Sequence, residues 1–243
     1  MKLIFYLLVF QCFSGSRPGD SVNAQKSEYQ SGTALTIVKN NGYLLDGVKQ
    51  LLVVFNKLPE NNSAILVVLE KKENDWTPVY TPINVGIGRD GFAAPGTKRE
   101  GDHKSPSGFF RLGQLFCNDK AVKTKMPYMQ ITSEDKWIDD PGSDDYNLHI
   151  RGLTRAKSWE NLKLSDNEYK YCMVIEYNMH PVVKGMGSAI FLHLTKKETP
   201  NPTAGCVVMN QRDMEWILNW MDPKLKPSII MGNEKILISG IKK

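Results

Sequence analysis

Short apolar runs separated by turn-forming residues dominate the pattern along the chain. Runs of Val, Ile, Leu and Tyr alternate with clusters of Gly, Pro, Asn and Asp, which is typical of β-strands joined by turns. The runs that we expect to be strands are residues 51–55, 64–70, 77–85, 128–132, 171–177, 189–194 and 228–231. The polar residues 71–75 are expected to form a hairpin loop between two of them. The pattern predicts one mostly-β domain.

A single convincing helix is predicted near the C-terminus. Asn210 stands at a capping position, apolar residues recur at helical spacing from Met214 to Met221, and Pro223 ends the pattern. We therefore expect few helices, all of them short.

The N-terminus has the pattern of a secretory signal peptide. Lys2 precedes eight uninterrupted apolar residues, 3–10, whereas a membrane-spanning helix needs about 20. Small residues at Val22 and Ala24 favour cleavage after residue 24, while Cys12 offers an alternative as a lipid-attachment site and membrane anchor. We therefore expect an exported protein with a signal peptide over 1–24, a leader or linker over 25–45 and one domain over 46–243.

Composition and charge exclude several functional classes. The 243 residues carry a net charge of +5, in an ordinary globular composition. Basic residues are scattered, so no nucleic-acid-binding stripe is expected. Residues 86–91 match G-x-G-x-x-G, but no helix pattern follows, so we expect a turn and no bound nucleotide. The four histidines lack metal-site spacing, so no metal and no other cofactor is expected.

The strongest candidate chemistry lies between residues 187 and 209. In the strand expected there, His193 points to the face opposite Leu192 and Leu194, as in a strand that lines a cleft. Twelve residues separate His193 from Cys206, few enough for two strands to lie side by side. An imidazole beside a thiol can take its proton, and the resulting ion pair lowers the thiol pKa.

The residue before Cys206 suits the same chemistry. Gly205 has no Cβ, so a substrate carbonyl can approach the backbone, and the amides of Gly205 and Cys206 are candidate oxyanion donors. A buried cysteine beside a glycine turn, with His193 in a purely structural role, explains the residues equally well. Cys117 and Cys172 are expected to be small buried hydrophobes or a disulfide pair.

Four ordered segments resemble the L,D-transpeptidase catalytic-domain (YkuD-like) family of bacterial cell-wall enzymes. They are residues 101–109, 137–147, 187–206 and 226–232, and they resemble most closely the branch with a shortened T-A-G-C nucleophile motif. The resemblance implies a β-sandwich-like domain with a few short helices and a Cys–His site, exported to the periplasm or anchored by lipid to the bacterial cell envelope.

The resemblance also implies a reaction and its residues. Cys206 would attack a peptidoglycan stem tetrapeptide before its terminal D-Ala, leaving a thioester that an amine acceptor resolves. His193 would be base and then acid, oriented by a backbone carbonyl, and Thr203 and Gly205 belong to the motif. Hydrolysis or amino-acid exchange at the same site (an L,D-carboxypeptidase) and a non-catalytic wall-binding domain remain open as well.

The sequence departs from the broad family at two positions of the nucleophile motif. Ala204 replaces a second histidine, and Val208 stands where the family has an arginine. Losing that arginine removes a fixed partner for a substrate carboxylate. Candidate substrate-binding residues that remain are Ser188, Arg151 and Arg155.

Overall fold

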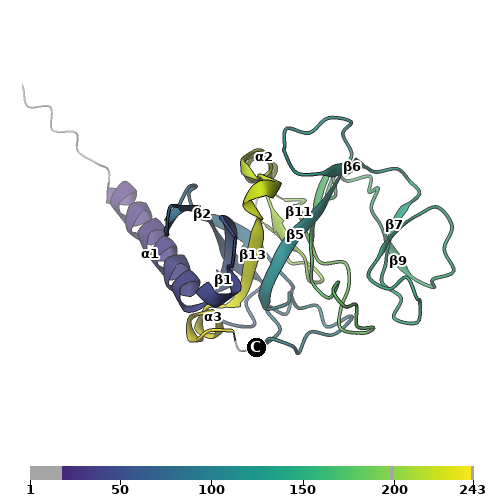
Figure 1. Ribbon diagram of the computed structural model, residues 1–243, viewed down its shortest axis with the longest axis horizontal. Helices are drawn as coiled ribbons and strands as arrows, with labels where there is room; N and C mark the ends of the chain where they lie inside the picture. Colours follow the sequence, from purple (N-terminus) through teal and green to yellow (C-terminus); the bar gives the residue numbers. More distant parts are fainter. Residues whose placement is uncertain (1–17, 198–199, 242–243) are drawn as a thin grey trace, which may run out of the picture.

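The computed structural model describes residues 18–197 and 200–241 (Figure 1). Residues 1–17 of the predicted signal peptide, with Cys12, lie outside the described residues. The helices are α1 (Pro18–Asn40), η1 (Gly42–Leu44), α2 (Gln211–Trp220), η2 (Pro223–Leu225) and α3 (Glu234–Ser239). The strands are β1 (Gln50–Asn56), β2 (Ser63–Lys72), β3 (Asp75–Pro78), β4 (Ile83–Gly86), β5 (Gly108–Cys117), β6 (Tyr128–Gln130), β7 (Asp135–Ile138), β8 (His149–Arg151), β9 (Trp159–Asn161), β10 (Tyr171–Ile175), β11 (Phe191–Leu194), β12 (Val207–Met209) and β13 (Ser228–Asn233).

Most of the strands belong to one large sheet whose ends pair with each other. From β1 the neighbours follow the order β13, β5, β10, β11, β12, β4 and β2, and β2 pairs back with β1. The sheet therefore closes into a barrel-like ring, with β3 added at β2 and β6 added at β5. The mostly-β fold expected from the sequence is confirmed.

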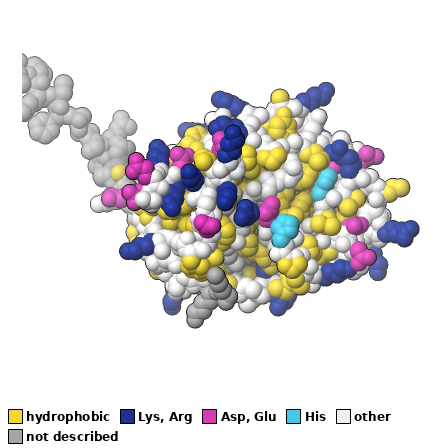
Figure 2. Space-filling model, in the orientation of Figure 1, with side chains coloured by type: hydrophobic (Ala, Val, Ile, Leu, Met, Phe, Trp, Pro, Cys, Tyr) yellow, Lys and Arg dark blue, Asp and Glu magenta, His cyan; other side chains and the backbone are white. Residues whose placement is uncertain are grey.

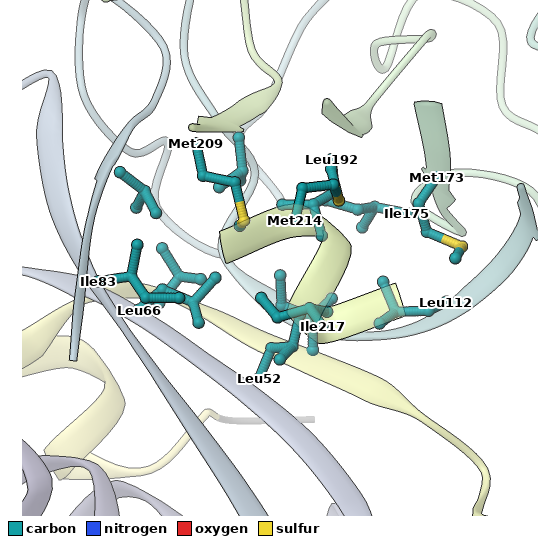
Figure 3. Close-up of a cluster of buried hydrophobic side chains, with 14 of the residues drawn as sticks. Leu52, Leu66, Ile83, Leu112, Met173, Ile175, Leu192, Met209, Met214 and Ile217 are labelled. Carbon is teal, nitrogen blue, oxygen red and sulfur yellow. The ribbon is translucent and has the colours of Figure 1, made fainter. Parts of the chain in front are cut away.

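The inside of the ring holds the main hydrophobic core, and α2 packs into it. Met214 and Ile217 of α2 meet side chains from strands around the ring, including Leu52, Leu66 and Leu192 (Figure 3). The Asn210 side chain caps the helix by accepting the backbone N–H of Asp213 at 2.9 Å. The predicted capped helix is thus confirmed, and its apolar face is the reason that it enters the core.

One outer face of the ring is covered by α1 and α3 (Figure 1). Ala34, Ile37 and Val38 from the last turns of α1 are buried against the sheet. The segment 25–45, expected to be a leader or linker, is helical for most of its length. The polar residues 23–33 hid it, because the apolar residues that pack appear only in its last turns. The predicted cleavage point after Ala24 falls within α1, before these buried turns.

A small separate sheet, ordered β8-β7-β9, covers another outer face of the ring (Figure 1). Trp137 of β7 packs edge-on against Phe191 of β11, with ring centroids 5.1 Å apart. Asp135, fully buried, accepts hydrogen bonds from Arg151 Nε at 2.8 Å and from Thr132 N at 2.7 Å, which ties the small sheet together. The small sheet and the outer face of β10 and β11 enclose a third hydrophobic cluster, separate from the core inside the ring and from the cluster under α1 and α3. Its buried residues are Phe116, Ile131, Trp137, Leu162, Tyr169, Cys172, Val174, Ala189, Phe191 and Cys206.

The strand expectations need correction in several places, and the short strands β7, β8 and β9 were not predicted at all. The run 77–85 is two strands, β3 and β4, because the chain leaves the ladder at residues 79–82. The long strand β5 was not predicted, since Arg111, Gly113 and Gln114 interrupt its apolar pattern. The hairpin loop expected at 71–75 does join β2 to β3. The other expected strands are present with shifted ends.

The outer surface mixes both signs of charge. In the view of Figure 2, Lys and Arg side chains are spread over the molecule with acidic side chains among them. Within residues 18–197 and 200–241, none of the helices combines the length and the apolar composition that a bilayer crossing needs.

Candidate active site

Cys206 lies immediately before β12, beside the strand that carries His193. β11 and β12 are parallel neighbours, with Leu192 opposite Val207 and His193 opposite Val208. The sequence prediction that these two segments lie side by side is confirmed. The Cys206 thiol donates to the carbonyl of Ala189 (Sγ to O 3.2 Å), and its sulfur accepts the backbone N–H of Phe191 at 3.3 Å.

The Ala189 carbonyl that receives the thiol is held in a strained conformation. Ala189 has φ of +53°, which is uncommon for a residue with a Cβ. Its N–H donates to Asn147 Oδ1 at 3.1 Å, and Trp137 Nε1 donates to the same oxygen at 2.9 Å. Asn147 Nδ2 is bound to the carbonyl of Asn178 at 2.8 Å. The segment 137–147, noted in the sequence for its resemblance alone, thus sets the position of the thiol's hydrogen-bond acceptor.

His193 is buried rather than exposed in a cleft. Its Nδ1 lies 3.0 Å from the carbonyl of Leu194, and its ring meets Tyr169 edge-on with centroids 4.8 Å apart. Donation from Nδ1 leaves Nε2 as the proton acceptor. The cleft-lining position predicted for His193 is wrong, because the third hydrophobic cluster covers this face of β11. Among the described residues, no hydrogen bond joins His193 to Cys206.

Burial keeps both groups of the Cys–His pair uncharged. It lowers the pKa of His193 to about 4, because an imidazolium would be desolvated there. Burial, reinforced by the neighbouring Glu160 carboxylate, raises the pKa of the Cys206 thiol well above its ordinary value. The site at neutral pH is a thiol beside a neutral imidazole, and the thiolate–imidazolium pair expected from the sequence is not its resting form.

A small pocket of about 170 Å³ opens beside Cys206. The lining residues come from the loop before β5, from the end of β7 and from β9, and from the segments just before β11 and just before β12: Lys98, Glu100, Gly101, His103, Asp139, Glu160, Ser188, Ala189, Ile190, Ala204, Gly205 and Cys206. His193 is not among them. The pocket therefore carries two carboxylates on the small-sheet side, Asp139 and Glu160, and a cation, Lys98, near Cys206.

Lys98 is a buried cation that sequence reasoning missed. Only 4% of its side chain is exposed, and Nζ lies 2.6 Å from Asp102 Oδ1 and 2.9 Å from the carbonyl of Arg99. Its charge acts to lower the pKa of Cys206, against the larger effect of burial. The only sequence signal was a lysine four residues before an aspartate in a polar loop, which does not distinguish a buried pair from an exposed one.

The candidate substrate-binding residues separate into one group in the pocket and one outside it. Ser188 lines the pocket and donates to Glu100 Oε2 at 2.7 Å. Arg151 instead binds Asp135 in the small sheet, and Arg155 lines a different depression beside Asp144 and Asp145. The structure therefore brings together Cys206, Gly205 and Ser188, and places both arginines outside the pocket that these three residues line.

The motif around Gly205 is locked by hydrogen bonds. The Gly205 N–H donates to Thr203 Oγ1 at 3.0 Å, and this hydroxyl donates to the carbonyl of Cys206 at 2.7 Å. Ser105 Oγ donates to the Gly205 carbonyl at 2.6 Å. A Cβ on Gly205 would lie 3.1 Å from the Lys104 carbonyl, so close backbone packing requires glycine here. Of the two predicted oxyanion donors, the Gly205 amide is already bound in the resting site.

The remaining described cysteines are buried and unpaired, and the acidic residues that the structure describes form no metal site. Cys117 and Cys172 are buried free thiols and do not form a disulfide with each other. Burial raises the pKa of Cys172 well above its ordinary value. Within the described residues no group of three or more His, Cys, Asp or Glu side chains is arranged to hold a metal ion.

Comparisons with known proteins identify the family to which this chain belongs. A search of the curated proteins gave no match. Among solved structures, the helical cell shape determining protein Pgp2 from Campylobacter jejuni is similar over 79% of this chain, with 14% identity and a TM-score of 0.43. The chain spans 52% of that protein's length. The model of the L,D-transpeptidase catalytic domain, YkuD, matches residues 59–230, which include β11, Cys206 and most of the ring. The chain therefore belongs to the L,D-transpeptidase catalytic domain (YkuD) family.

Proposed function

We propose that this chain is an exported cysteine L,D-transpeptidase that acts on peptidoglycan stem peptides. The observation that carries the proposal is the setting of Cys206, which two backbone groups of the segment 189–191 hold at a pocket beside the His193 strand. Family membership supports a function on peptidoglycan. The predicted signal peptide supports export.

In the first half-reaction, Cys206 Sγ attacks the amide carbonyl before the terminal D-Ala of a stem tetrapeptide. The thiol proton passes to Nε2 of His193, which requires the thiol to leave the Ala189 carbonyl and turn toward the imidazole. His193 then protonates the departing amine of D-Ala, and a thioester to Cys206 remains. The Leu194 carbonyl orients His193 throughout by holding Nδ1.

The charges around the nucleophile assist this step. Negative charge develops first on sulfur and then on the carbonyl oxygen of the substrate, and the Lys98 charge stabilises both. Lys98 is also the cation best placed to attract the D-Ala carboxylate, in place of the arginine that Val208 replaces. Thr203 must release the Gly205 amide before that amide can bind the oxyanion.

Release of D-Ala from a purified disaccharide tetrapeptide, followed by mass spectrometry, tests the proposal. The Cys206→Ala variant should release none, and a cross-linked dimer should appear as the product of the wild type. D-Ala release that persists in this variant contradicts the mechanism. A tripeptide product without dimer assigns the chain to L,D-carboxypeptidase activity instead.

Two further measurements test catalysis against simple wall binding, and export against lipid anchoring. The intact mass after incubation with a carbapenem should show one adduct, which should be absent in Cys206→Ala. Muropeptide binding without an adduct and without D-Ala release identifies a non-catalytic wall-binding domain.

Cell fractionation of the full chain beside a Cys12→Ser variant tests export and lipid anchoring, since only a lipoprotein loses its membrane attachment in the variant.

A further inference from the structure

Glu160 is a carboxyl group that the first half-reaction does not use, although it lines the same pocket as Cys206. It lies in β9 of the small sheet, opposite Trp137 of β7. The hydroxyl of Tyr169 donates to Glu160 Oε2 at 2.6 Å, and the Tyr169 ring packs against His193. Glu160 is therefore fixed from behind and faces the space that a second substrate enters.

Asp139, at the end of β7, lines the same side of the pocket. Its Oδ1 atom is buried and has no hydrogen-bond partner in the described structure. A buried carboxylate oxygen without a donor is costly. Glu100, the third acid of the pocket, is already satisfied by Tyr146 and Ser188. Asp139 therefore has a buried carboxylate oxygen that a bound cation would satisfy, and Glu160 lines the same pocket.

Proton balance in the second half-reaction calls for a base at this position. A primary amine of pKa about 10 arrives as an ammonium ion at neutral pH. It must lose one proton before its nitrogen attacks the thioester, and a second when the amide forms. One of these protons returns to Cys206 Sγ, and the other is released to solvent. His193 accepts one proton at a time and returns it to Cys206 Sγ, so the other proton of the ammonium needs a second acceptor, and this acceptor must line the pocket.

We propose that Glu160 is a catalytic residue of the acceptor half-reaction, which receives the proton of a primary ammonium that Asp139 helps to bind. The Glu160 carboxylate takes one proton, and the free amine attacks the thioester carbonyl. The second proton moves from nitrogen through His193 to Cys206 Sγ as the C–S bond breaks. Glu160 then releases its proton to solvent. The inference rests on the proposed function and adds the chemistry by which the acceptor is recognised.

The charges around Glu160 suit this task. Burial, with the carboxylates of Asp139, Glu100 and Glu168 nearby, raises the pKa of Glu160 to about 7, although the hydrogen bond from Tyr169 opposes this. Cys206 and Lys98 also line the pocket that it faces. A carboxyl with a pKa near the working pH is an effective proton acceptor. An ammonium in the pocket favours its ionised form, so the acceptor itself prepares the base.

Two acceptors of different charge test the proposal on the purified chain. The donor is a disaccharide tetrapeptide, and the acceptors are a lysine-containing stem peptide, which is an ammonium ion, and hydroxylamine, which is largely uncharged at neutral pH. In Glu160→Gln we expect transfer to the lysine acceptor to fall about 100-fold. D-Ala release in excess hydroxylamine should stay within about twofold of the wild type. Asp139→Asn should raise KM for the lysine acceptor alone, and Glu134→Gln, at an exposed acid next to β7, should change neither reaction.

The outcomes separate failure of the inference from failure of the proposed function. Equal slowing of both acceptors in Glu160→Gln means that Glu160 has only a structural role, and unchanged transfer to the lysine acceptor also overturns the inference. If the wild type releases no D-Ala with either acceptor, the proposed function itself is wrong. Wild-type transfer to the lysine acceptor should rise through pH about 7, and this rise should be absent in Glu160→Gln.

Discussion

The side-chain oxygen of Asn147 and the backbone N–H of Ala189 are joined by a 3.1 Å hydrogen bond. This bond holds Ala189 in its left-handed conformation, and the carbonyl of Ala189 then accepts the Cys206 thiol. Through Trp137, the same oxygen connects the small sheet to the segment before β11. The position of the Cys206 thiol therefore depends on a contact between two sheets.

Asn147→Ala should weaken both the fold and the site. Removing the side chain leaves the Trp137 indole and the Ala189 amide without an acceptor, and each buried unsatisfied group costs about 1–3 kcal/mol. We expect the free energy of unfolding in urea to fall by about 3 kcal/mol. At temperatures where the variant is folded, the rate of acylation by a carbapenem should fall at least about tenfold. A tenfold fall corresponds to an activation free energy higher by about 1.4 kcal/mol. Asn62→Ala, at an exposed position, is the control. An unchanged acylation rate in the folded variant contradicts a role for Asn147 in placing the thiol.

The raised pKa of Cys206 predicts slow alkylation at neutral pH. The reactive thiolate is a small fraction of the site below its pKa, so the rate with iodoacetamide should rise about tenfold per pH unit in the alkaline range. Cys172 and Cys117 should not react while the chain is folded, because both are fully buried. Mass mapping of the alkylated protein, with Cys206→Ala as control, measures this. Rapid alkylation of Cys206 at pH 6 would show that an ion pair with His193 exists at rest.

Lys98→Met should make the thiol less acidic. The Lys98 charge lowers the pKa of Cys206, so its removal should shift the pH dependence of alkylation upward by about one unit and slow carbapenem acylation about tenfold. Asp102 keeps the N–H groups of Arg99 and Lys104 as donors, so the loop should remain folded. Lys120→Met, at an exposed lysine, should leave both rates unchanged. No upward shift in Lys98→Met would mean that the Lys98 charge does not reach the sulfur.

Glu160 should make stability depend on pH in a defined window. Its pKa is raised from the ordinary 4.5 to about 7 in the folded chain, so the protonated carboxyl is the form that the fold favours. The stability that this contributes is complete below pH 4.5 and is lost as the pH rises through about 7. Glu160→Gln, which cannot ionise, should therefore gain up to about 3 kcal/mol relative to the wild type between pH 5 and pH 8. Urea unfolding at the two pH values measures this difference, with Glu134→Gln as control. If the free energy of unfolding changes equally between pH 5 and pH 8 in the wild type and in Glu160→Gln, Glu160 does not ionise in this window.

Local patterns along the chain were sufficient for much of the fold and for proposing Cys206 as the nucleophile. Strand runs, the capped helix α2 and the pairing of the segments that carry His193 and Cys206 follow from short-range periodicity and loop length, which act within a few residues. The motif with Thr203, Gly205 and Cys206 is contiguous, and its family resemblance did not depend on packing. These features are therefore readable before any tertiary contact is known.

The charge states of the site residues, and which of them line the pocket, are determined by tertiary packing. Glu160 and Cys206 are 46 residues apart and meet only because the small sheet docks on the outer face of β10 and β11. His193, which the alternation of its strand predicted to be open, is buried against Tyr169, and Arg151 binds Asp135 within the small sheet and not the pocket. Desolvation depends on everything packed around a group, so no local pattern could report that Cys206 and His193 are neutral or that Lys98 is buried. The order of residues was enough to propose Cys206 and His193 as the reacting groups, and the packing around them set their charge states and decided that Cys206, and not His193, lines the pocket.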